Sequence, residues 1–202
     1  MALDPQIVAV LQQFGGLPQP DFERLDPLEY RQFSDSLMPP LPGEALFEVR
    51  DIKVAGADGK LDARLYRPVE GNELPLLVFF HGGGFVMGTL DTHDNLCRSL
   101  ARLSGAVVVS VAYPLTPFPQ PVDTGYDVLK WVHRNRTKLG GQGALVYLAG
   151  EEAGGNLAAA VSLMARDQSH PPLAGQILLS PMLDPCVGTA SLREATGDST
   201  GC

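Results

Sequence analysis

Two short motifs carry residues whose types and spacing could support acyl-transfer chemistry. The run His81-Gly82-Gly83-Gly84 follows an apolar stretch, and its glycines can present backbone N–H groups to a developing oxyanion without side chains in the way. Residues 150–156 read Gly-Glu-Glu-Ala-Gly-Gly-Asn and join an apolar run to an Ala-rich run, the setting of a tight turn that displays a nucleophile. A glycine triplet alone more often forms an ordinary turn, but the second motif in this order and context favours a shared site.

Alternating strands and helices would bring both motifs to one edge of a sheet. A period-two alternation predicts an antiparallel hairpin first, and buried strands then alternate with amphipathic helices. We expect hairpin strands at 47–54 and 61–66, later strands at 74–80, 106–111, 145–149 and 176–179, and helices at 91–103, 122–139 and 154–166. This order predicts an α/β fold with a mostly parallel sheet and helices on both faces, whose functional groups gather at the carboxyl ends of the strands.

The chain divides into three segments by composition and pattern. Residues 1–48 are punctuated by proline and hold two weak helical patterns, at 5–14 and 25–37, so we assign them to an N-terminal helical cap segment. Residues 49–185 hold the alternating pattern of the core. Residues 186–202 lack a core pattern, and we expect an irregular tail there.

Composition narrows the function classes. The chain has 202 residues, a net charge of −8 and no basic stripe, which argues against nucleic-acid binding. No apolar stretch reaches the ~20 residues of a membrane span, and residues 1–13 lack the basic start of a secretory signal. Cys97, Cys186 and Cys202 are too few and too scattered for a disulfide framework or a zinc site. We therefore expect reduced thiols in a cytoplasmic protein, with no cofactor and no metal.

The two motifs resemble those of the hormone-sensitive-lipase type of α/β-hydrolase esterases. That family carries HGGGF, which residues 81–85 match, and G-[DE]-S-A-G-G-N-L-A-A, which residues 150–159 match at every place but one. The resemblance implies an α/β-hydrolase fold with an N-terminal cap over an acyl site, and it implies the hydrolysis of carboxylic esters.

The resemblance also assigns roles to single residues. It implies that Gly83, Gly84 and Ala153 donate the N–H groups of an oxyanion hole, and that His81 has a structural role in its motif. Position 152 then carries the nucleophilic serine, but this chain has Glu152 there. A carboxylate attacks an ester far more weakly than an activated serine does. We expect the Glu152 carboxylate, at a helix N-terminus, to accept hydrogen bonds from those N–H groups and to fill the oxyanion hole.

The base and the acid of the family's triad have no clear counterpart. In this fold the acid and the histidine follow the nucleophile. The only histidine after Glu152 is His170, which we expect at the far end of a helix, opposite the site. His93 and His133 fall in helical patterns, and we expect them on the solvated surface. The family carries its acid and histidine on strands beyond 176–181, so we expect a truncated core that lacks the last strands.

The leading interpretation is an esterase-like homologue that is catalytically inactive as this chain. One alternative is a functional esterase or lipase for short acyl esters, completed by another chain. Another is a non-enzymatic protein that binds a small acyl ester ligand or interacts through its surface, and a degenerate gene product stays open as well. Because the strand near 176–181 would be an unpaired edge with exposed apolar side chains, we expect a homo-oligomer or a partner chain there.

Overall fold

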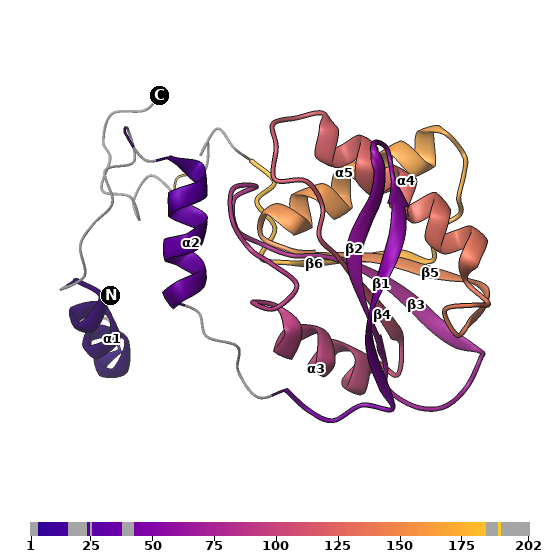
Figure 1. Cartoon of the computed structure of the whole chain (residues 1–202), viewed down its shortest axis with the longest axis horizontal. Helices are drawn as coiled ribbons and strands as arrows, with labels where there is room; N and C mark the ends of the chain where they lie inside the picture. The colour runs from indigo at the N-terminus through magenta and orange to yellow at the C-terminus, as the bar shows by residue number, and fades with distance from the viewer. Residues whose placement is uncertain (1–3, 16–23, 25, 38–42, 185–189, 191–202) are drawn as a thin grey trace.

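The computed structural model of the chain describes residues 4–15, 24, 26–37, 43–184 and 190. Figure 1 shows a twisted sheet with helices packed on it and two further helices on the N-terminal side. The order of the strands and helices after the first hairpin follows the alternation that the sequence predicts.

Within the described residues, six strands form one sheet in the order β1-β2-β4-β3-β5-β6. The strands are β1 (Glu48–Gly56), β2 (Gly59–Arg67), β3 (Leu74–Phe80), β4 (Val107–Val111), β5 (Gly141–Glu151) and β6 (Gly175–Leu179). β1 pairs with β2 and β2 with β4 in antiparallel orientation, whereas β4, β3, β5 and β6 pair in parallel. The predicted hairpin and mostly parallel sheet are confirmed, and β5 begins earlier than the predicted residue 145.

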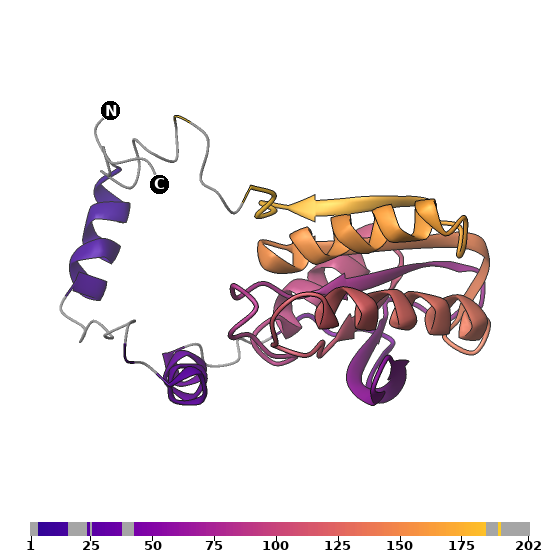
Figure 2. The same cartoon turned by 90° about the horizontal axis from the view of Figure 1, so that it is seen from above.

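Helices cover both faces of the sheet, as Figure 2 shows from above. α3 (Asp94–Ser104) packs against β2 and β4 on one face. α4 (Gln120–Asn135) and α5 (Ala153–Asp167) lie together on the other face, where α5 contacts β3, β5 and β6. Because side chains alternate along a strand, Val78 of β3 joins the core under α4 and α5, whereas Phe79 joins the core under α3.

The N-terminal segment forms the two helices that its weak periodicity predicts. They are α1 (Pro5–Gly15) and α2 (Pro27–Leu37). Asp26 caps α2 by accepting hydrogen bonds from backbone N–H groups of its first turn. The Arg31 guanidinium of α2 donates to the carbonyl oxygen of Val86 at 2.5 Å, which ties this helix to the loop after β3. α1 lies apart from the sheet in both views (Figures 1 and 2), and the boundary of the segment with the core stays a prediction.

The predicted tail, residues 186–202, lies outside the described residues apart from residue 190, and so do Cys186 and Cys202. Cys97 is a buried free thiol. None of the helices in the described ranges combines the length and the apolar character that crossing a membrane requires. The same ranges hold no group of three or more His, Cys, Asp or Glu side chains placed to bind a metal ion.

Candidate active site

The corner at Glu152 joins β5 to α5 through a strained backbone conformation. Glu152 has a φ of 51° and a ψ of −110°, a region that residues with side chains rarely adopt. Close packing holds the corner in place: a Cβ on Gly150 would overlap the Gly154 carbonyl group, and a Cβ on Gly154 would overlap the carbonyl oxygen of Phe80. The small residues around Glu152 therefore bring the start of α5 against the end of β3, at the carboxyl edge of the sheet.

The turn after β3 supplies backbone donors on the other side of the site. Gly83 has a φ of 122° and Gly84 a φ of 60°, conformations that favour glycine. A Cβ on Gly83 would overlap the carbonyl group of Met87, whose N–H donates back to the Gly83 carbonyl oxygen at 3.0 Å. This folding-back of the loop turns the N–H groups of both glycines toward the corner at Glu152.

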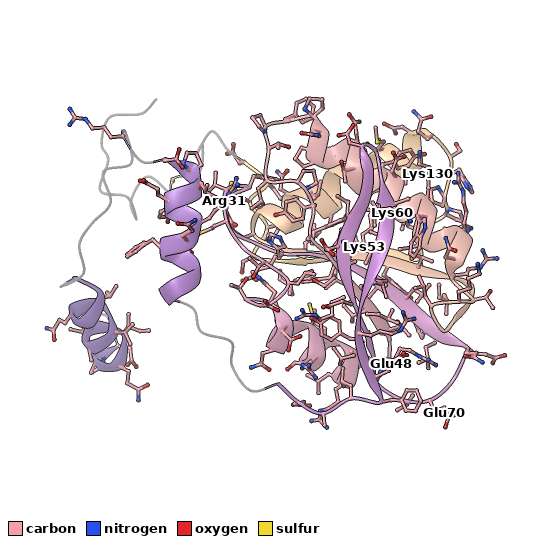
Figure 3. All side chains as sticks on the ribbon, viewed as in Figure 1. Arg31, Glu48, Lys53, Lys60, Glu70 and Lys130 are labelled. Atoms are coloured by element: carbon pink, nitrogen blue, oxygen red, sulfur yellow. The ribbon has the colours of Figure 1, made fainter. Side chains whose placement is uncertain are left out.

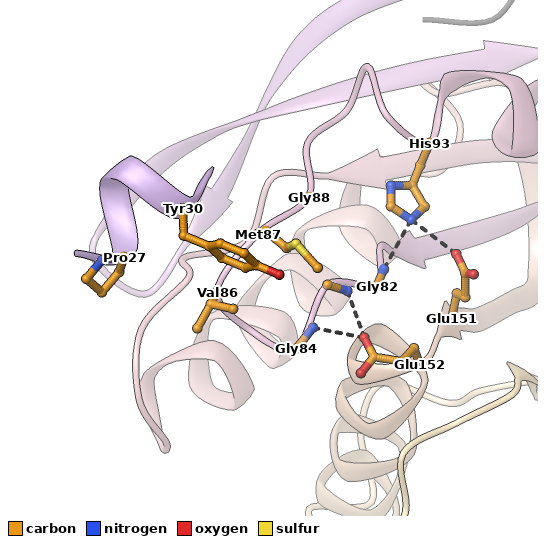
Figure 4. Close-up of a pocket in the computed structure, with 11 residues that line it drawn as sticks. Pro27, Tyr30, Gly82, Gly84, Val86, Met87, Gly88, His93, Glu151 and Glu152 are labelled. Atoms are coloured by element: carbon orange, nitrogen blue, oxygen red, sulfur yellow. Dashed lines mark hydrogen bonds and ion pairs between the residues drawn. The ribbon is translucent and has the colours of Figure 1, made fainter. Parts of the chain in front are cut away.

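The Glu152 carboxylate occupies these donors. Its Oε2 accepts hydrogen bonds from the N–H of Gly83 at 2.8 Å and from the N–H of Gly84 at 2.9 Å (Figure 4). The sequence predicts both of these hydrogen bonds. Partial burial raises the pKa of Glu152, but hydrogen bonds from the backbone N–H groups of Gly83, Ala153 and Gly84 outweigh it and hold that pKa below its usual value. The side chain is therefore a carboxylate at neutral pH, placed where an acyl-transfer site would hold an oxyanion.

His81 is a buried and neutral side chain at the base of the glycine turn. It is 1% exposed, and its ring stacks on Tyr113 with 4.5 Å between the ring centroids. The Tyr113 hydroxyl donates to the His81 carbonyl oxygen at 2.8 Å, and His81 Nδ1 lies 2.8 Å from the Gly82 carbonyl oxygen. Burial lowers the pKa of His81 to about 4. These contacts join the His81 ring and backbone to Tyr113 and Gly82, and the role of His81 in its motif stays a prediction.

His93 lies in the site, so the prediction of a solvated surface position was wrong. Its side chain is 15% exposed, and its Nε2 lies 3.1 Å from Glu151 Oε2 and 3.4 Å from the backbone nitrogen of Gly82 (Figure 4). Periodicity placed His93 within a helix, whereas α3 begins only at Asp94. The start of a helix that follows a parallel strand lies at the carboxyl edge of the sheet, and that rule could have placed His93 in the site.

The other two histidines lie away from Glu152. His170 follows the end of α5, opposite the corner where that helix begins, which agrees with the prediction for it. The His133 ring contacts the His170 ring edge-on, with 5.6 Å between centroids. His133 is half-buried, not solvated as predicted, and burial is the main cause that lowers its pKa.

A cavity of about 610 Å³ opens between α2 and the glycine turn. Figure 4 shows Tyr30 reaching from α2 toward Met87 on one side of it, with Glu151 and Glu152 on the other. Its lining consists of Pro27, Tyr30, Gly82, Gly83, Gly84, Val86, Met87, Gly88, His93, Glu151 and Glu152. Among these described lining residues, the titratable groups are the two carboxylates, His93 and the Tyr30 hydroxyl, and no lysine or arginine contributes.

The chain is similar to known proteins over most of its core. A family model described as alpha/beta hydrolase fold matches residues 77–200. The chain is 42% identical over 147 residues to carboxylesterase NlhH of Mycobacterium tuberculosis, a match that covers 69% of this chain and 46% of that protein. It is 39% identical over 141 residues to gibberellin receptor GID1C of Arabidopsis thaliana, covering 66% of this chain and 40% of that protein. The chain thus spans less than half of the length of either relative.

Solved structures agree with this similarity. The structure described as a hyperthermophilic esterase from Pyrobaculum calidifontis aligns with a TM-score of 0.82 and 40% sequence identity. The alignment covers 94% of this chain and 62% of that chain, so it includes most of the sheet and its helices.

Proposed function

The chain belongs to the α/β-hydrolase fold family, and from that premise we propose that it is an esterase-like homologue that does not hydrolyse esters by a serine mechanism. One observation carries the proposal: Glu152 Oε2 accepts both N–H groups of the glycine turn, at 2.8 Å from Gly83 and 2.9 Å from Gly84. In acyl transfer, such donors stabilise the oxyanion that forms when the nucleophile attacks. Here the residue at the nucleophile position occupies them itself.

This occupancy opposes ester hydrolysis in two ways. An ester carbonyl oxygen must displace the carboxylate before it can bind the N–H groups of Gly83 and Gly84. The hydrogen bonds that hold the pKa of Glu152 below its usual value also withdraw electron density from the oxygen that would have to attack. A weakly basic carboxylate held in this way is a poor substitute for a serine hydroxyl activated by a neighbouring base.

The described side chains near the corner also do not offer the general base of a serine mechanism. His93 is the histidine that lines the cavity, and its Nε2 faces Glu151 at 3.1 Å instead of Glu152. His81 is buried against Tyr113 and already bonded to the turn. An active esterase would therefore need a base from outside the described residues, and Glu152 would still hold the donors.

Hydrolysis of p-nitrophenyl acetate tests the proposal directly. We expect the wild-type chain to release p-nitrophenol no faster than Glu152→Ala, in which the carboxylate is absent. Wild-type turnover that Glu152→Ala abolishes would overturn the proposal. Glu152→Ser should be assayed beside them, because it frees both donors and restores a hydroxyl nucleophile. An inert Glu152→Ser chain identifies the lack of a base as a second, independent cause of inactivity.

Binding of a small ligand without catalysis is the second candidate function, and the cavity favours it. Its volume of about 610 Å³ falls within the usual size of small-molecule sites, about 300–1,000 Å³. The relative named as a gibberellin receptor supports this candidate, since a protein of similar sequence is named for binding. Short acyl esters should then raise the unfolding temperature of the wild-type chain. The absence of any shift at millimolar ester would contradict the acyl-ligand form of this role.

We also propose the outer edge of β6 as an association surface for a second copy or a partner chain. Within the described residues β6 pairs on one side only, with β5. Ile177 on this strand is 40% exposed, and Leu183 just beyond it is 57% exposed. An unpaired edge with exposed apolar side chains favours strand pairing with another chain. Light scattering at micromolar concentration should give a mass above that of the monomer, and a monomeric mass would contradict homo-oligomerisation.

A further inference from the structure

The described lining of the cavity beside Glu152 carries two carboxylates and no lysine or arginine. Glu152 and Glu151 both line it, at the corner between β5 and α5, and His93 and the Tyr30 hydroxyl are its other titratable groups. The remaining described lining near these groups is glycine or apolar and aromatic side chains. Arg31, the neighbour of Tyr30 on α2, directs its guanidinium to two backbone carbonyl oxygens, at 2.5 Å and 3.0 Å.

The groups that would attract an anion to this cavity are already used. The N–H groups of Gly83 and Gly84 both donate to Glu152 Oε2, and the start of α5 faces the same carboxylate. A second anion would therefore meet a negative charge, with the N–H groups of Gly83 and Gly84 already donating to it. Both hydrogen bonds from the turn fall on Oε2, and Oε1 is the acceptor that we assign to a ligand.

The opposite wall of the cavity is suited to an apolar group. Tyr30 reaches across from α2, and Val86 and Met87 flank it on the loop after the glycine turn (Figure 4). An aromatic ring and a thioether can also lie against a cationic head group or the methylenes next to it. The cavity thus joins an anionic end at Glu152 to an apolar end at α2.

From this arrangement we propose that the cavity binds a small amphiphilic amine. Its ammonium group donates to the carboxylate of Glu152 and, secondarily, to that of Glu151, whose Oε2 also lies 3.1 Å from His93 Nε2. Its apolar chain lies along Tyr30, Val86 and Met87. The inference rests on the proposed function in one respect, since it needs the Glu152 carboxylate to stay in the glycine turn.

Three ligands of equal chain length and different head-group charge test the proposal. Isothermal titration calorimetry of the wild-type chain with hexylammonium, hexanol and hexanoate separates charge from apolar contact. We expect hexylammonium to bind about tenfold or more tightly than hexanol, the worth of one charge-assisted hydrogen bond, and hexanoate to bind most weakly. Equal affinities, tighter binding of hexanoate, or no binding of hexylammonium at millimolar concentration would each overturn the proposal.

A pair of charge-removing variants locates the effect. Glu152→Gln should abolish the preference for hexylammonium over hexanol, and Glu152→Asp should retain part of it. Glu70→Gln is the matched control, because Glu70 is exposed and lies on the opposite side of the molecule from Arg31 and α2 (Figure 3). Circular dichroism confirms that each variant is folded. Equal losses in Glu152→Gln and Glu70→Gln would assign the preference to overall charge and overturn the site.

The two proposals fail in different ways. Ester hydrolysis by the wild-type chain overturns the inactive role of Glu152, whatever the calorimetry shows. A catalytically silent chain that does not prefer hexylammonium leaves that role intact and overturns only the amine site.

Discussion

Glycine should replace Glu152 with less loss of stability than alanine does, because the backbone at this corner favours glycine. Both substitutions remove the carboxylate and its two hydrogen bonds, so those losses cancel in the comparison. What remains is a φ of 51° with a ψ of −110°, which costs a residue with a side chain about 1–3 kcal/mol. Glycine avoids this strain, but its greater freedom in the unfolded chain costs about 0.5–1 kcal/mol of stability relative to alanine. The glycine variant should therefore be more stable by about 1 kcal/mol.

Urea denaturation measures this difference. With a denaturant dependence of about 2 kcal/mol per molar urea, Glu152→Gly should unfold at a midpoint about 0.5 M higher than Glu152→Ala. The same pair of substitutions at Ser162, inside α5, should give the opposite order, because glycine destabilises an ordinary helix by about 1 kcal/mol relative to alanine. An alanine variant at position 152 that equals or exceeds the glycine variant in stability would refute the argument that this corner is strained.

Two further predictions concern the packing that holds the site. Burial lowers the pKa of His81 from 6.5 to about 4, so the neutral ring contributes its full stability above pH 6.5 and loses it as the pH falls toward 4. An NMR titration of His81 should place its midpoint near 4, and a midpoint at 6.5 would contradict its burial. Gly154→Ala should destabilise the chain by about 1–3 kcal/mol or more in thermal unfolding, because the new Cβ would overlap the Phe80 carbonyl oxygen. Gly15→Ala is its control, since no heavy atom lies within 4 Å of a Cβ there, and equal losses in both variants would count against the close contact of β3 with α5.

The strands and helices of the core were largely predictable because local pattern and tertiary packing agree there. The apolar run at 74–80 has the same bounds as β3, since a glycine turn ends it and both of its faces are buried. The bond between Glu152 and the glycine turn was also predictable, because a carboxylate at a helix start seeks N–H donors and the motif places them next to it.

The rest of the site depends on contacts between distant parts of the chain. The pairing of His93 with Glu151 joins two residues far apart in sequence, and helical periodicity alone extends the helix past His93. Arg31 helps to position α2 by donating hydrogen bonds to backbone carbonyl oxygens. Because every residue carries a carbonyl group, no side-chain pattern in the sequence could have identified those acceptors.

The hydrogen bonds of Glu152 also have a consequence for competition. The Glu152 carboxylate belongs to the same folded chain as these donors, so it behaves as a bound ligand that cannot diffuse away, and such tethering corresponds to an effective concentration of at least millimolar order. Any free carboxylate, phosphonate or other oxyanion must outcompete this internal ligand before it reaches Gly83 and Gly84. In the role that we propose for it, Glu152 acts as an inhibitor joined to its own chain. Covalent probes that need the N–H groups of Gly83 and Gly84 to be free should therefore react poorly.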